Sequence, residues 1–70
     1  MQLWIEGFAA TGESGPAQLL GSYDAKTLKE VVEMWVAEEG TRRVYYNSKE
    51  LSYWGCQFFD NELDARKVYG

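Results

Sequence analysis

Cys56 is the side chain of this sequence with the greatest intrinsic reactivity, and it is the only cysteine among the 70 residues. A catalytic or redox cysteine needs a thiolate that is stabilised by a base, a cation or a helix N-terminus. The sequence has no histidine to act as that base, and aromatic residues surround Cys56. We therefore expect a buried, unreactive thiol within a strand, which is how most free cysteines behave.

The acidic residues gather in two places that could pair carboxylates for acid–base chemistry. Glu38 and Glu39 end an amphipathic segment, where they form a solvated polar end. Asp60, Glu62 and Asp64 suit the cap and first turn of a helix, because negative charge is favourable there. Neither group has the spacing of a calcium loop. The sequence thus predicts a protein that is not an enzyme and that uses no cofactor or metal.

The segment 12–15, Gly-Glu-Ser-Gly, is similar to the beginning of a phosphate-binding loop. That loop needs a lysine for the phosphates and a serine or threonine for magnesium. Pro16, Ala17 and Gln18 follow instead. Because the residues that perform the chemistry are missing, we interpret the segment as a hairpin turn.

Length and charge restrict the remaining classes of function. Seventy residues make a single small domain, 1–70, whose stability must come from apolar packing or from a second subunit, since no intrachain disulfide can form. A net charge of −4 opposes binding to nucleic acid or to an anionic membrane surface. The sequence shows no secretory signal and no apolar run of about 20 residues. These features are typical of a cytoplasmic protein.

The elements that position these residues begin with a predicted hairpin. Alternating apolar residues predict strands over 2–10 and 17–23, and the turn residues of 11–16 separate them. A helix is expected over 26–39, with either Asp24 as its N-cap or Thr27 and Glu30 as a capping box. Its apolar stripe consists of Leu28, Val31, Val32, Trp35 and Val36.

The second half predicts another hairpin and a short helix. Strands over 42–47 and 51–60 enclose a turn at 47–50, and Gly55 suggests a bulge. Asp60 or Asn61 then caps a helix over 62–69. The predicted fold is α+β with the order β-β-α-β-β-α: a mostly antiparallel four-stranded sheet packed against one long helix, followed by a short C-terminal helix.

The predicted sheet is apolar on both faces. Leu3 and Ile5 point to one face of the first strand and Trp4 to the other, while alternation places Tyr53 opposite Phe58 unless a bulge at Gly55 changes the register. One helix can cover only one face. The second face must meet the C-terminal helix, a second chain or a ligand.

Aromatic residues give the strongest functional indication, because six of the eleven lie within 44–59. We expect an interaction module that binds a protein, or a second copy of itself, through an aromatic sheet face with an acidic rim. Its first candidate contacts are Trp4, Tyr46, Trp54 and Phe58, since aromatic residues are enriched at interface hot spots. A compact acidic chain of this kind would suit an inhibitor of a basic host protein that is encoded by a phage or mobile element.

The competing hypothesis is binding of single-stranded nucleic acid through Arg42, Arg43, Tyr45 and Lys49. Cations beside exposed aromatic rings are typical of such surfaces. The excess of acidic residues makes this the weaker prediction.

Overall fold

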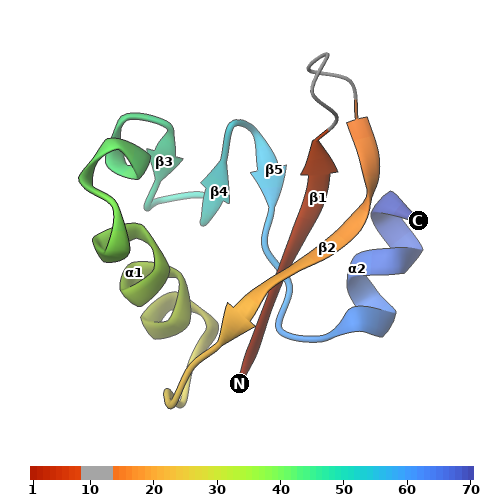
Figure 1. Ribbon diagram of the computed structural model, residues 1–70, viewed down its shortest axis with the longest axis horizontal. Helices are drawn as coiled ribbons and strands as arrows, with labels where there is room; N and C mark the ends of the chain where they lie inside the picture. The colour runs from red at the N-terminus through yellow and green to blue at the C-terminus, as the bar shows by residue number, and fades with distance from the viewer. Residues whose placement is uncertain (9–13) are drawn as a thin grey trace.

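The computed structural model describes residues 1–8 and 14–70, and Figure 1 shows its ribbon. The described elements are, in chain order, β1 (Gln2–Phe8), β2 (Ser14–Ser22), α1 (Leu28–Glu38), the 3-10 helix η1 (Gly40–Val44), β3 (Tyr46–Asn47), β4 (Ser52–Tyr53), β5 (Cys56–Gln57) and α2 (Glu62–Tyr69). The α+β class is confirmed. Neither α1 nor α2 has the length and apolar character that crossing a bilayer requires.

The prediction of one four-stranded sheet is wrong for the described residues. They form a two-stranded antiparallel sheet, β1–β2, and a three-stranded antiparallel sheet, β3–β4–β5. One isolated bridge joins β1 to the chain that follows β5: the backbone N–H of Trp4 and of Phe59 each donate to the carbonyl of the other at 2.8 Å. β1 therefore lies between β2 and the chain that follows β5 (Figure 1).

The β1–β2 hairpin confirms the first two predicted strands. Ala9, Ala10 and residues 11–13 of the predicted turn lie outside the described residues, and residues 14–16 of that turn instead belong to β2. Its pairing register changes twice, between Leu3 and Trp4 and again between Glu6 and Gly7. A Cβ atom at Gly7 would collide with the carbonyl oxygen of Pro16, so this close approach of the strands requires glycine.

Helix α1 covers one face of this hairpin. Thr27 is its N-cap, because its Oγ1 accepts from the backbone N–H of Glu30 at 3.2 Å, and the alternative cap, Asp24, is not used. The predicted apolar stripe faces the sheets. The buried core on this side consists of Leu3, Ile5, Val31, Val32, Trp35, Val36, Cys56 and Phe58.

Helix α2 covers the opposite face. Of the three predicted possibilities, the C-terminal helix is therefore what meets the second apolar face. Figure 1 shows α1 and α2 on opposite sides of β1 and β2. Trp4, Ala17 and Ala65 form the buried cluster between α2 and the hairpin. The N-cap of α2 is Asn61, whose Oδ1 accepts from the backbone N–H of Asp64 at 2.8 Å.

The second half of the chain departs furthest from the prediction. The expected strand over 42–47 is a 3-10 helix up to Val44 and pairs only at Tyr46 and Asn47. The expected strand over 51–60 is broken into β4 and β5 by a tight turn. This turn, rather than a bulge, resets the alternation, so that Tyr53 and Phe58 pack on the same side, with ring centroids 6.5 Å apart.

Candidate functional site: an aromatic corner

The tight turn between β4 and β5 places a tryptophan in an unusual backbone conformation. Tyr53 pairs with Cys56, which leaves Trp54 and Gly55 as the two turn residues. Their φ angles are 54° and 75°. Two positive φ angles match the two-residue turns that join hairpin strands, and these turns favour Asn, Asp and Gly. Gly55 suits its position, whereas Trp54 occupies one that a bulky residue rarely adopts.

The ring of Trp54 lies on the surface beside Tyr45. The two ring centroids are 5.0 Å apart, and the backbone N–H of Trp54 donates to the carbonyl of Tyr45 at 3.1 Å. Trp54 is 60% exposed and Tyr45 is 50% exposed. Val44, which precedes Tyr45 in the chain, is 77% exposed. We call Val44, Tyr45 and Trp54 the aromatic corner.

The loop between β3 and β4 holds these short strands in register. The Asn47 side chain accepts from the backbone N–H groups of Lys49 and Glu50 at 3.0 and 3.2 Å. This is the local bonding by which asparagine stabilises a turn. Leu51 completes the loop with a φ of 54°. The predicted turn at 47–50 is therefore present, and it returns the chain so that Tyr53 pairs with Tyr46.

The four predicted contact residues are not brought together on one surface. Phe58 is 2% exposed and packs in the core under α1, while Trp4 is 7% exposed and packs under α2. Tyr46 is half-buried, and burial together with the nearby Glu33 carboxylate raises the pKa of its phenol. Of the four, only Trp54 is largely exposed. Tyr45, the exposed residue beside Trp54, is not among the four. Its position next to Tyr46 is the indication in the sequence, since adjacent residues of the strand predicted over 42–47 would point to opposite sides.

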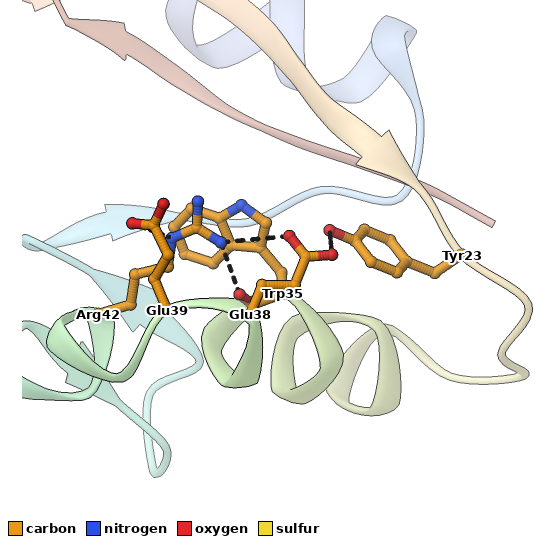
Figure 2. Close-up of polar contacts among 5 residues, drawn as sticks. All are labelled: Tyr23, Trp35, Glu38, Glu39 and Arg42. Carbon is orange, nitrogen blue, oxygen red and sulfur yellow. Dashed lines mark hydrogen bonds and ion pairs between the residues drawn. The ribbon is translucent and has the colours of Figure 1, made fainter.

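Arg42 has a structural role at the end of α1 (Figure 2). Its guanidinium lies 4.1 Å from the ring centroid of Trp35 and donates to the carbonyl of Trp35 at 2.7 Å. It also forms ion pairs with Glu38 and Glu39 at 3.4 and 3.7 Å. A cation bonded to one of the last carbonyls of a helix stabilises the negative end of the helix dipole.

The same cluster ties the end of β2 to α1. The hydroxyl of Tyr23 donates to the Glu38 carboxylate at 2.8 Å, as Figure 2 shows. Burial and this carboxylate raise the pKa of Tyr23 to about 12. The phenol is therefore neutral at physiological pH and remains a hydrogen-bond donor.

The residues of the nucleic-acid hypothesis are also separated. Arg42 is engaged by Trp35, Glu38 and Glu39, and so it is poorly placed to bind a phosphate. Lys49 lies in the loop at one end of the β3–β4 pair, whereas Tyr45 lies beyond the other end. Arg43, Tyr45 and Lys49 are exposed, so this alternative stays a prediction.

Cys56 is buried, as the sequence predicted. Its thiol donates to Oε2 of Glu6 at 3.1 Å. Burial, followed by the hydrogen bond and the negative charge of Glu6, raises the pKa of Cys56 to about 11. The sulfur is a neutral thiol at physiological pH, which is the opposite of what a cysteine nucleophile requires.

Comparison with known proteins supplies no relative, since no protein-family model, curated protein or solved structure matches the chain. Within residues 1–8 and 14–70, no group of three or more Cys, Asp or Glu side chains could hold a metal ion.

Proposed function

We propose that the protein is an interaction module that inserts Trp54, with Tyr45 beside it, into an apolar pocket of a partner protein. The supporting observation is the position of Trp54 in the turn. A left-handed backbone costs a residue other than glycine about 1–2 kcal/mol, and Trp54 nevertheless leaves most of its ring in water. Asparagine would serve this turn better. A large ring kept at such a position is expected to act outside the fold.

The size of the aromatic corner favours a different protein over a second copy of this chain. The corner exposes on the order of 400 Å² of side chain, which is typical of a functional patch on a soluble protein. A stable dimer buries about 800 Å² on each subunit. A symmetric contact at this corner would set one protruding turn against another. A partner with a concave surface can enclose the ring and bury the area around it.

The test is the substitution Trp54→Asn. We expect the free energy of unfolding to change by less than about 1 kcal/mol, because the relief of backbone strain offsets the lost contact with Tyr45. We expect the same substitution to abolish partner capture, since a central tryptophan commonly contributes about 2 kcal/mol or more to an interface, roughly 30-fold in affinity. Urea unfolding measures the first effect. Affinity capture from cells that express the chain, followed by binding of the identified partner in purified form, measures the second.

The matched control is Leu63→Asn on α2, where Leu63 is 68% exposed. This variant removes an exposed apolar side chain of similar accessibility and should retain the partner. Equal loss of capture in both variants, or no capture that depends on Trp54, would contradict the proposal.

Two further measurements on the wild-type chain separate the alternatives. Light scattering over a range of concentrations detects a dimer formed through the corner. A dimer that Trp54→Asn disrupts would mean that the corner binds a second copy of the chain and not a different protein.

Titration with a fluorescent oligouridine at low salt tests the nucleic-acid hypothesis, because counterion release is largest there. Binding that depends on Trp54 would overturn the proposed class of partner.

A further inference from the structure

The chain contains two asparagines, Asn47 and Asn61, and the fold places them in contrasting environments. An asparagine can lose its side-chain amide spontaneously when the backbone nitrogen of the next residue attacks its Cγ atom, which makes asparagine a thermolabile residue. The reaction needs the attacking nitrogen close to Cγ, a stabilised negative charge on Oδ1 and a side-chain amide that can leave.

The loop between β3 and β4 meets these requirements at Asn47. Its Oδ1 accepts from the backbone N–H groups of Lys49 and Glu50 at 3.0 and 3.2 Å. Two amide donors on one oxygen form the arrangement that stabilises an oxyanion. No described residue accepts a hydrogen bond from the Asn47 Nδ2. Residues 47–50 are all exposed to water, and the side chain of Ser48 is small enough to leave its backbone nitrogen accessible.

Asn61 is protected by the contacts that cap α2. Its Nδ2 donates to the carboxylates of Asp60 and Asp64, and its Oδ1 accepts from the backbone N–H of Asp64 at 2.8 Å. The two carboxylates hold the amide in place, and their charges oppose a further negative charge on the neighbouring oxygen. The nitrogen that would attack belongs to Glu62, the first residue of the helix.

We propose that Asn47 is a site of spontaneous deamidation that the fold itself promotes. The backbone nitrogen of Ser48 gives its proton to water and bonds to Cγ of Asn47, and the N–H groups of Lys49 and Glu50 stabilise the negative charge that forms on Oδ1. The Cγ–Nδ2 bond then breaks, and Nδ2 leaves as ammonia after taking a proton from water. A water molecule opens the resulting cyclic imide at either carbonyl, which gives aspartate or isoaspartate. The site does not depend on the proposed binding function.

The two products affect the loop differently. Aspartate keeps an oxygen for both amide donors and suits such a turn as well as asparagine does. Isoaspartate places Cβ in the main chain at position 47, which pairs with Ser52, and so lengthens β3 against β4. Because the next pair is Tyr46 with Tyr53, the turn that presents Trp54 should move when isoaspartate forms.

The test is incubation of the purified protein at physiological pH and temperature, followed by proteolysis and mass spectrometry of the peptides that contain each asparagine. We expect Asn47 to deamidate at least about tenfold faster than Asn61, the internal control, because a single oxyanion donor contributes a still larger factor in enzymes. Equal rates at the two positions, or faster loss at Asn61, would overturn the proposal.

A second measurement separates the effect of the fold from that of the local sequence. In guanidinium chloride at the same pH the donors at Oδ1 are lost, so the rate at Asn47 should fall at least about threefold. An equal or higher rate in the unfolded chain would mean that the fold does not promote the reaction.

The effect on the turn is measured by amide chemical shifts in ¹⁵N-labelled protein. The Trp54 signal should shift in the isoaspartyl fraction and keep its position in the matched variant Asn47→Asp. A Trp54 signal that is the same in both would overturn the link between the loop and the turn.

Discussion

The face of the β1–β2 hairpin under α1 is filled by large side chains, whereas small side chains bring α2 close to the face beneath it. Trp35 and Phe58 meet in the first core with ring centroids 5.6 Å apart. In the second, Ala17 and Ala65 flank Trp4, and Ala65 is completely buried. The stability of the α1 face depends on the volume of its side chains, and that of the α2 face on the close approach of helix and strand. A smaller side chain should therefore destabilise the α1 face, and a larger side chain the α2 face.

The largest expected effect is that of Phe58→Ala. Removal of this ring should cost about 3–5 kcal/mol through lost burial and the cavity that remains. That loss is comparable to the whole stability of a domain of this size. We expect the variant to be largely unfolded at 25 °C by circular dichroism. Phe59→Ala, the neighbouring and only half-buried position, is the control and should still melt cooperatively. Equal losses of stability in Phe58→Ala and Phe59→Ala would contradict the view that the α1 face depends on large buried side chains.

Ala65→Leu tests the α2 face with an intermediate effect. The added methylene groups have no space between α2 and the hairpin, so we expect the free energy of unfolding to fall by about 1–3 kcal/mol. Ala37→Leu makes the same change at an exposed position of α1 and should be nearly neutral. Urea titration of the two variants gives the difference. Little change at Ala65 would mean that α2 can move away from the sheet without loss.

The smallest expected difference concerns two arginines, each of which lies over a tryptophan. Arg42 is 4.1 Å from the Trp35 ring and bonds its carbonyl, whereas Arg66 is 5.6 Å from the Trp4 ring and pairs with Glu62 on the surface. We expect Arg42→Ala to cost about 1–2 kcal/mol. Arg66→Ala should cost less than about 0.5 kcal/mol, as exposed pairs do. Thermal unfolding at low and high salt checks both values, and a larger loss at Arg66 would reverse the comparison.

The helices could be predicted from the sequence because their signals are local. The stripe from Leu28 to Val36 repeats with the helical period, and Asn61 stands directly before the helix that it caps. The alternation of Leu3, Trp4 and Ile5 also indicated two apolar faces correctly. Each of these patterns involves residues that lie close together in the sequence.

The second half could not be predicted in the same way. The strand pattern of 51–60 assumes that alternation continues past Trp54, and a tryptophan gives no indication of a positive φ. Once the turn is formed, Phe58 belongs to the core and Trp54 to the surface. The prediction that Trp4 and Phe58 are contact residues rests on residue type alone. Burial depends on long-range contacts that residue type does not report.

The bridge between Trp4 and Phe59 constrains the order in which the parts of the chain fold. Hairpins closed by short turns form within microseconds, and β3, β4 and β5 are joined only by such turns. The bridge instead closes a loop that contains most of the chain, and the entropy of this closure must be lost before Phe58 and Phe59 can pack against the β1–β2 hairpin. During synthesis, β1 must therefore wait for residue 59 to leave the ribosome before either hydrophobic core can be completed.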